Sequence, residues 1–470
     1  MNKYKTLLSN TFLISMGTFA SKLLVFFMVR FYTDYLTTSQ YGTADLITQT
    51  ANLLFPVISL GITEGVFRFG LSKENNPKSV FSTGLWIISA GALLFAAIIP
   101  ALCLVNDFKG YVWLIVVYTL AACLHSLCAQ YIRAIGKTAL FAIQGIINTS
   151  LVIILNIIFL TGVLGVNLGV TGYVLSVAVA DTLCALFLII KEKLWRLITL
   201  KIEKTILKDM LKYSIPLIPT TIFWWITSVS DRYMVNEFIS PEANGIYAVS
   251  YKLPTLLTLV STVFMQAWQF SAVTEDDGDK EEHAKFFSKV WGSFQAVMFL
   301  AGGFVIAFAK IAMKLLTTYE FYSSWEYVPL LSVAMIFTAF TSFMGTVYVV
   351  NKKSVISFLT ALVGAVTNII LNLILIPSPL GVQGAAIATV ASYVLVFIIR
   401  SINARKYIKF KLHIGHIILN SIIIFIQTLV MIFEVNYFII IESLALISLL
   451  IINLKFIKGF LTKILSFAKK

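Results

Sequence analysis

The sequence predicts an all-α integral membrane protein with fourteen transmembrane helices. We expect two pseudo-symmetric six-helix lobes around a central cavity, with two further helices at the C-terminal end. Three observations predict this fold: a composition suited to lipid, a one-sided distribution of basic residues, and an internal repeat. Apolar residues make up 59% of the 470 residues and charged residues 12%, with a mean hydropathy of +0.90. A soluble domain is about 45–50% apolar and about 25% charged, so an ordinary soluble protein is excluded.

Apolar segments long enough to cross the hydrocarbon core of a bilayer follow one another along the whole chain. Charged residues or clusters of Gly, Pro and Asn separate them. We expect helices over residues 9–33, 42–66, 80–105, 111–132, 139–161, 168–190, 211–236, 244–270, 286–312, 328–350, 355–376, 381–402, 414–434 and 436–457.

The basic residues test this plan independently. With the N-terminus inside, 29 of the 36 Lys and Arg residues fall in inner connections, and only Lys109, Lys310 and Lys314 fall in outer ones. Cytoplasmic loops carry such an excess of Lys and Arg. One miscounted span would reverse the side of every later loop, so the bias predicts a multi-pass protein with both termini in the cytoplasm.

An internal repeat divides the chain into two halves. Leu155-Asn156 followed by Gly165 matches Leu371-Asn372 followed by Gly381, with an offset of 216 residues for both landmarks. Six spans are an even number, so both halves have the same orientation, and two such bundles enclose a cavity that can open to either side. The predicted domains are an N-terminal lobe at 1–190, a cytoplasmic amphipathic linker at 191–212, a C-terminal lobe at 211–403, helices thirteen and fourteen at 414–457, and a basic cytoplasmic tail at 458–470.

Four cations fall inside predicted spans, where a charge at the bilayer centre costs about 2.5–3.5 kcal/mol and normally faces the bundle interior or a water-filled cavity. Lys22 lies in the middle of span one and Arg30 two turns further on, Arg232 lies in span seven, and Lys252 lies in span eight. For Arg30 and Lys252, reaching out to the headgroups is an alternative. Several fixed cations and few anions favour an anionic ligand such as a phosphate group.

Other polar residues at membrane depth are candidates for substrate binding, gating or ion coupling. Adjacent helical residues point to different faces, so Asp231 and Arg232 are expected to have different partners. Two interpretations stay open for the others: they line the cavity or couple a cation, or they join helices by hydrogen bonds and ion pairs. The candidates for substrate binding are Asp231, Gln49 and Asn52, and those for gating or coupling are Glu64, Arg68, Asp45 and Asp181.

No arrangement of residues in the sequence resembles enzyme chemistry. The four cysteines lie in apolar stretches, which favours reduced packing residues. His413 and His416 have no third ligand nearby, so no metal site is predicted. No phosphate-binding P-loop occurs, and the outer loops are short. We therefore predict no enzyme, no cofactor and no nucleic-acid partner, and the choice between Na⁺ and H⁺ as a coupling ion stays open.

Several motifs resemble the oligosaccharidyl-lipid flippases of the multidrug/oligosaccharidyl-lipid/polysaccharide (MOP) exporter superfamily, the Wzx type of polysaccharide biosynthesis protein. The similarity covers essentially the whole chain. The motifs are Gly17-Thr18-Phe19-Ala20-Ser21-Lys22-Leu23, Tyr41-Gly42, Ser230-Asp231-Arg232-Tyr233, Asn244-Gly245-Ile246-Tyr247, and residues 368–377 followed by Gly381 and Gly384-Ala385-Ala386.

The resemblance implies a flippase of the bacterial plasma (inner) membrane with a MATE-like fold. It would move a polyprenyl-diphosphate-linked oligosaccharide from the inner to the outer leaflet by alternating access, for the synthesis of O-antigen, capsule or exopolysaccharide. Lys22, Arg30, Arg232 and Lys252 would then meet the diphosphate. Membrane lipid and other polysaccharide assembly proteins are the further partners that the resemblance suggests.

Three alternatives stay open at this point. A lipid II flippase has the same fourteen-helix layout. A MATE-type multidrug exporter usually has twelve helices and an acidic site for cationic drugs. A membrane-embedded glycan polymerase or ligase generally relies on a sizeable outer loop, which this chain does not offer.

Overall fold

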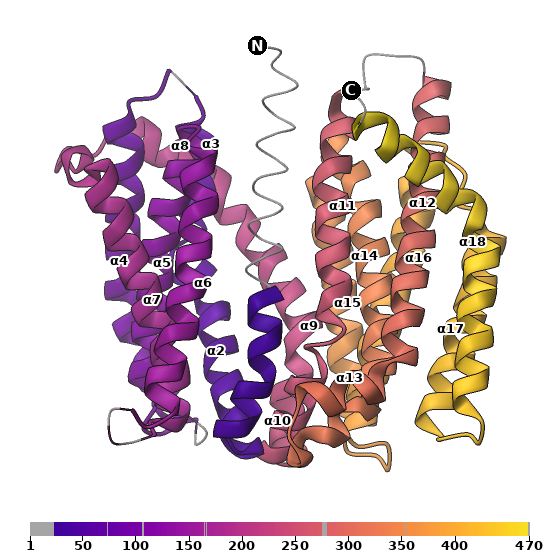
Figure 1. The fold of residues 1–470 in the computed structure, drawn as a ribbon. Coiled ribbons are helices and arrows are strands. Elements are labelled where there is room, and N and C mark those ends of the chain that lie inside the picture. The colour runs from indigo at the N-terminus through magenta and orange to yellow at the C-terminus, as the bar shows by residue number, and fades with distance from the viewer. Residues whose placement is uncertain are drawn as a thin grey trace. The chain divides into compact units, whose positions relative to one another are not determined.

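The computed structural model describes residues 23–72, 74–105, 108–163, 165, 167–274, 280–351 and 353–468, and all regular structure in these residues is helical (Figure 1). Ten of the described helices are long and apolar enough to cross a membrane, and two bent helix pairs raise this number to twelve. Residues 23–35 are also helical, but most of predicted span one lies outside the described residues. Helix α9 (Ile218–Phe238) is not among the twelve; Asp231, Arg232 and two tryptophans make it less apolar. The fold is therefore the predicted all-helical membrane fold, with a count compatible with fourteen spans.

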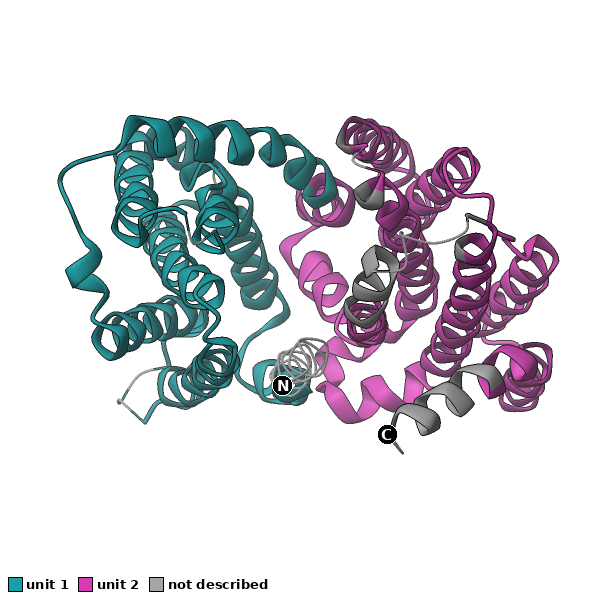
Figure 2. Ribbon diagram, turned by 90° about the horizontal axis from the view of Figure 1, so that it is seen from above, with its two compact units in different colours: residues 1–225 teal, residues 226–470 magenta. Residues whose placement is uncertain are grey.

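The chain forms two compact units, residues 1–225 and 226–470, which are coloured separately in Figure 2. Helix α9 crosses the boundary between them along the chain. The helices of the first unit that follow residue 35 are α2 (Thr38–Ile58), α3 (Ile62–Gly70), α4 (Pro77–Cys103), α5 (Val112–Ala134), α6 (Thr138–Leu160), α7 (Gly169–Glu192), the short 3₁₀ helix η2 (Leu194–Leu197), α8 (Lys204–Ser214) and a 3₁₀ turn η3 (Ile215–Leu217).

The predicted span over 42–66 is broken in the structure. Helices α2 and α3 meet at an angle of 56°. At the break, Leu60 and Gly61 both have positive φ and adopt the left-handed backbone conformation. A Cβ at Gly61 would lie 3.1 Å from the carbonyl oxygen of Ser214. Glycine thus gives both the left-handed conformation and the close approach, and hydropathy alone does not reveal such a break.

The predicted linker packs onto α4 rather than hanging free. The Ser82 hydroxyl donates to the carbonyl oxygen of Leu197 (2.7 Å), and Trp86 Nε1 donates to that of Thr199 (2.9 Å). Within the following helix α8, Ile206, Met210 and Ser214 are buried four residues apart. One face of α8 is therefore covered by protein, and its lysines lie on the other faces.

The second unit contains the C-terminal part of α9 and the remaining helices. These are α10 (Pro241–Ser250), α11 (Thr255–Thr274), α12 (Lys280–Ala307), α13 (Ala309–Leu316), the 3₁₀ helix η4 (Tyr319–Glu326), α14 (Val328–Val350), α15 (Ser354–Leu375), α16 (Val382–Ala404), α17 (Ile414–Ile432) and α18 (Phe438–Ala468). Helices α10 and α11 form the second bent pair, at 42°.

Aromatic side chains fill the centre of the second unit. Trp291 is fully buried, with its ring centroid 5.1 Å from those of Phe340 and Phe343, and its Nε1 donates to the carbonyl oxygen of Leu412. Buried aromatic rings contribute much apolar area and prefer such offset or edge-on geometries. This cluster joins α12 and α14 to the segment before α17.

The internal repeat is visible in the helix boundaries. Helices α5, α6 and α7 begin at 112, 138 and 169, and α14, α15 and α16 begin at 328, 354 and 382. In each set, a glycine of positive φ lies at the end of the connection between the second and third helices: Gly169 is the first residue of α7, and Gly381 directly precedes α16. The two units thus share a helix plan, as the offset of about 216 residues predicts.

The last two helices pair through buried amides. Asn420 and Asn453 exchange hydrogen bonds between α17 and α18, and Gln427 donates to Glu442 (2.6 Å). Interhelical amide bonds of this kind join helices in lipid. The pair packs against α12, so helices thirteen and fourteen belong to the second unit.

Candidate functional site

A buried polar cluster centred on Asp231 connects three helices of the second unit. The Asp231 side chain is fully buried. Its Oδ2 accepts from the hydroxyls of Tyr247 and Tyr251 (both 2.7 Å) and of Thr389 (3.2 Å), and its Oδ1 accepts from the backbone N–H of Arg232 (2.9 Å). Hydroxyl and amide donors thus surround a carboxylate that would otherwise be costly at membrane depth.

Amide and hydroxyl side chains extend this cluster to α15. The Ser230 hydroxyl donates to Asn368 Oδ1 (2.9 Å), Asn372 Nδ2 donates to the same oxygen (2.9 Å), and Asn368 Nδ2 lies 3.4 Å from Thr389 Oγ1. Asn368 and Asn372 are fully buried. Since Ser230 lies on α9 and Thr389 on α16, these bonds fix the positions of α9, α15 and α16 relative to each other.

Arg232 and Lys252 lie beside this cluster. The Arg232 guanidinium lies over the ring of Tyr251, 4.5 Å from its centroid, and the residue is 8% exposed. Asp231 has further partners in Tyr247 and Thr389, but it shares Tyr251 with Arg232: the Tyr251 hydroxyl donates to Asp231, and the Arg232 guanidinium lies over the Tyr251 ring. Lys252 lies half-buried in the turn that joins α10 to α11. In the sequence, two of the four predicted cations are therefore next to residues of the Asp231 cluster: Arg232 follows Asp231, and Lys252 follows Tyr251.

A second buried cluster, in the first unit, surrounds the predicted coupling residue Asp181. His125 Nδ1 lies 2.8 Å from Asp181 Oδ1, and His125 Nε2 lies 2.6 Å from Gln144 Oε1. Asn148 Nδ2 also donates to Asp181 Oδ1 (2.7 Å). Helices α5, α6 and α7 meet at this point.

His125, Gln144 and Asn148 are not among the residues predicted from the sequence. The signal was present, because an ionisable histidine near the middle of an apolar span is rare and normally faces the bundle interior.

The candidates on α2 are spread along the helix. Asp45 is 8% exposed and lies 3.5 Å from the Gln49 amide nitrogen. The carbonyl oxygen of Gln49 accepts from Trp225 Nε1 (3.2 Å), and Asn52 Oδ1 accepts from the Tyr118 hydroxyl (3.3 Å).

Glu64, Arg68 and Arg30 are exposed. Within the described part of the chain no ion pair joins Glu64 to Arg68; the Arg68 guanidinium instead lies 5.2 Å from the centroid of the Tyr213 ring. Arg30 pairs with Asp34 at 3.3 Å. Lys22 lies outside the described residues.

Arg400 differs from its expected position. It is one of the 29 basic residues assigned to inner connections, although it falls near the end of the predicted span over 381–402, and in the structure it lies within α16, 3% exposed. Its Nε donates to Thr360 Oγ1 (2.9 Å), and its other nitrogens donate to the carbonyl oxygens of Thr341 and Ser357. The side chain therefore joins α14, α15 and α16.

In the segments that the structure describes, no three His, Cys, Asp or Glu residues lie close enough together to hold a metal ion. The hydroxyls of Tyr247 and Tyr251 direct their protons at Asp231 and, together with the adjacent Arg232, stabilise a negative charge there.

The model of the family described as "Polysaccharide biosynthesis protein" matches residues 7–269, which is more than half of the chain. The chain belongs to this polysaccharide biosynthesis family. A search of curated proteins by sequence found no match.

Solved structures of MOP-superfamily transporters have the same fold. A lipid II flippase MurJ in an inward closed conformation matches with a TM-score of 0.69 at 16% identity, over 97% of this chain and 100% of that one. An inward-facing multidrug resistance MATE family transporter matches with a TM-score of 0.68 at 13% identity, over 87% of this chain and 99% of that one. A MOP superfamily transporter from Pyrococcus furiosus Vc1 matches with a TM-score of 0.59 at 14% identity, over 85% and 95% of the two chains.

The family model confirms the resemblance to polysaccharide biosynthesis proteins noted in the sequence, and the solved structures confirm the fold. The chain is a multi-pass membrane protein of the polysaccharide biosynthesis family, with the fold of flippases and multidrug transporters.

Proposed function

We propose that this protein is a lipid-linked oligosaccharide flippase. It moves a glycan joined to a polyprenyl diphosphate from the inner to the outer leaflet of the bacterial plasma membrane by alternating access. The observation that carries the proposal is membership of the polysaccharide biosynthesis family by a chain whose fold is that of transporters. A transporter contributes to glycan synthesis by carrying an intermediate across the membrane.

The charges inside the spans support a diphosphate as the head group. Cations with several donors suit phosphate oxygens. We assign the contact with the diphosphate to the four cations of the predicted spans, Lys22, Arg30, Arg232 and Lys252, of which Arg30 also pairs with Asp34 and Arg232 lies over the ring of Tyr251. The basic residues of the inner connections place both termini in the cytoplasm in this proposal.

The test is leaflet transfer of a labelled lipid-linked glycan in proteoliposomes that contain the purified full-length chain. A flippase transfers the glycan with no change in its length. Lengthening of the glycan would instead indicate a polymerase, and extrusion of cationic dyes without glycan transfer would indicate a drug exporter. Transfer of lipid II in preference to other glycans would make the protein a lipid II flippase.

Two charge variants test the site. Lys22→Ala and Lys252→Ala should each lower the transfer rate strongly at unchanged protein level, and Lys22→Arg should retain part of the activity because it keeps the charge. Lys204→Ala, an exposed lysine at the start of α8, is the matched control and should transfer at the normal rate. If Lys22→Ala and Lys252→Ala both transfer the glycan at the normal rate, the assignment of the diphosphate site is refuted.

A further inference from the structure

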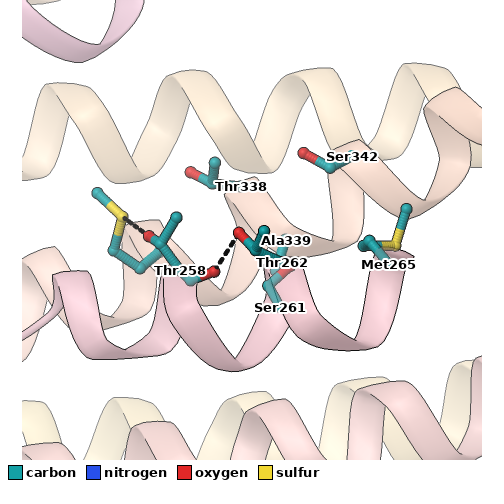
Figure 3. Close-up of a pocket in the computed structure, with 8 residues that line it drawn as sticks. Thr258, Ser261, Thr262, Met265, Thr338, Ala339 and Ser342 are labelled. Carbon is teal, nitrogen blue, oxygen red and sulfur yellow. Dashed lines mark hydrogen bonds between the residues drawn. The ribbon is translucent and has the colours of Figure 1, made fainter. Parts of the chain in front are cut away.

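A cavity of about 320 Å³ lies between α11 and α14 of the second unit (Figure 3). Its volume is at the lower end of the range for small-molecule sites, about 300–1,000 Å³. None of the eight described residues that line it carries a charge. Five of them bear hydroxyl groups: Thr258, Ser261, Thr262, Thr338 and Ser342.

Three of these hydroxyls have already used their single proton. Thr262 donates to the carbonyl oxygen of Thr258 (2.7 Å), and Thr258 donates to the sulfur of Met335 (3.5 Å), as the dashed lines in Figure 3 show. Thr338 donates to the carbonyl oxygen of Ala334 (2.8 Å), and it also shares a hydrogen bond with Tyr393. A hydroxyl has one proton and two lone pairs, so the oxygens of these threonines can act towards a ligand only as acceptors.

Three of the five hydroxyl oxygens meet a ligand only as acceptors, which favours ligands that bring donors, whereas the hydroxyls of Ser261 and Ser342 can also donate. The hydroxyl and amide N–H groups of a neutral sugar can donate to these oxygens. A carboxylate or phosphate brings only acceptors and would lose its hydration without a cation to replace it. An acceptor-rich, uncharged cavity therefore favours neutral sugars over acidic ones.

The remaining lining is apolar and adaptable. Met265 and Met335 come from the two helices, and Ala339 lies one turn along α14 from Met335. Thioethers are polarisable and fill irregular gaps, so they suit the C–H faces of a sugar ring while the hydroxyls of the ring meet the threonines.

The order of groups along the chain matches the order of groups in the lipid-linked glycan. Lys252 lies in the turn before α11 and precedes Thr258 by six residues of the chain. In a polyprenyl-diphosphate-linked glycan the sugars follow directly after the diphosphate. A diphosphate held at Lys252 would therefore be followed by sugars near the hydroxyls of α11.

We propose that the cavity between α11 and α14 is a glycan subsite that accepts a neutral, hydroxyl- or amide-bearing sugar residue of the transported lipid-linked glycan. The identity of the transported molecule rests on the proposed function, whereas the preference for a neutral sugar rests on the cavity itself.

Cysteine protection tests occupancy directly. Ser342 lines the cavity and is exposed, so Ser342→Cys provides a maleimide target there. Cys103 is exposed and must be removed as Cys103→Ser, whereas the other three cysteines are buried. Ser443→Cys on α18 is the matched control, because Ser443 is also an exposed serine of a long helix. Three probes share one polyprenyl diphosphate and carry no sugar, a neutral disaccharide, or a disaccharide with a uronate.

The neutral probe should slow labelling of Ser342→Cys several-fold, more than the uronate probe does, and the probe without sugar should leave the labelling rate unchanged. None of the probes should protect Ser443→Cys. Equal protection by the sugar-free probe would make the occupant a lipid chain or diphosphate and overturn the proposal. Equal protection by the uronate probe, stronger protection by a cationic dye, or no protection would also overturn it.

A hydroxyl variant tests the same subsite through transfer. Thr262→Val should slow transfer of the neutral glycan lipid about fivefold, the factor for one neutral hydrogen bond of about 1 kcal/mol, and leave transfer of the sugar-free lipid unchanged. Thr161→Val removes an equivalent hydroxyl, bonded to Ile157 at 2.7 Å, and should transfer normally. If the wild-type chain moves no lipid but the neutral disaccharide still protects Ser342→Cys, the proposed function fails and the sugar subsite stands.

Discussion

Substitution of Gly384 by alanine should destabilise the second unit through a single added methyl group. Gly384 lies in the first turn of α16, and a Cβ there would lie 2.5 Å from the carbonyl oxygen of Leu375 and 2.7 Å from its carbonyl carbon. The oxygen distance is about 0.9 Å short of ordinary van der Waals contact at 3.4 Å. Because both neighbouring atoms belong to the backbone at the end of α15, a side-chain rotation cannot relieve the overlap.

The expected magnitude follows from this overlap. Overpacking that forces a backbone shift typically costs about 1–3 kcal/mol. Each kcal/mol lowers the melting temperature of a unit of this size by about 2–4 °C. A shift of α16 would also move Thr389 away from Asp231, 3.2 Å apart in the structure, and would weaken the network that joins α9, α15 and α16.

The assay is thermal unfolding of the purified full-length protein in detergent, with Gly145→Ala as the matched control. Gly145 lies within α6, and a Cβ there would meet nothing within 4 Å. Alanine at that position should therefore raise the free energy of unfolding by up to about 1 kcal/mol, because alanine has a higher helix propensity than glycine. A melting temperature for Gly384→Ala equal to or above that of Gly145→Ala would refute the reasoning.

Three further predictions concern other parts of the molecule. His125→Ala should lower the melting temperature, since it removes a 2.8 Å partner of the buried Asp181 at a cost of about 1.5–3 kcal/mol; an unchanged melting temperature would contradict the geometry. Burial and then the nearby Glu434 carboxylate raise the pKa of Glu326, so its folded form holds its proton to higher pH and stability is lost as pH rises from about 4.5 through the raised pKa. Thermal unfolding between pH 4 and 7 should show this loss in the wild type and less of it in Glu326→Gln, and identical pH profiles would exclude the effect. Cys103 is the one exposed cysteine among four free ones, so Cys103→Ser should abolish maleimide labelling of the native protein, and residual labelling would show that a second cysteine opens to solvent.

Apolar runs predict the helices well because lipid requires an unbroken length of apolar side chains and satisfies no backbone group. Predicted spans such as 111–132 and 139–161 differ from α5 and α6 by no more than two residues at either end. The break between α2 and α3 could not be predicted in this way. It depends on Gly61 and on its distance to Ser214, more than 150 residues later in the chain.

The candidate site shows a different limit. That Asp231 must have partners follows from its position in a span, but their identity does not. Tyr247, Tyr251 and Thr389 lie 16, 20 and 158 residues away. The hydroxyl-lined cavity was not predicted, because serine and threonine in an apolar helix are unremarkable until a second helix places more of them opposite.

The polar residues of the second unit therefore belong to two groups that the sequence does not distinguish. In the Asp231 cluster, hydroxyl, amide and backbone donors are bonded to Asp231 and Asn368, and most of the side chains are buried, so these bonds join α9, α15 and α16. In the cavity, Thr262 and Thr258 satisfy their protons within the protein but keep lone pairs on oxygens that are only half-buried. A hydrogen-bond acceptor that a ligand can reach lowers the free energy of binding a donor, whereas one enclosed by protein stabilises the fold. Substitutions in the first group should thus act mainly on the melting temperature, and substitutions in the second group mainly on the choice of glycan.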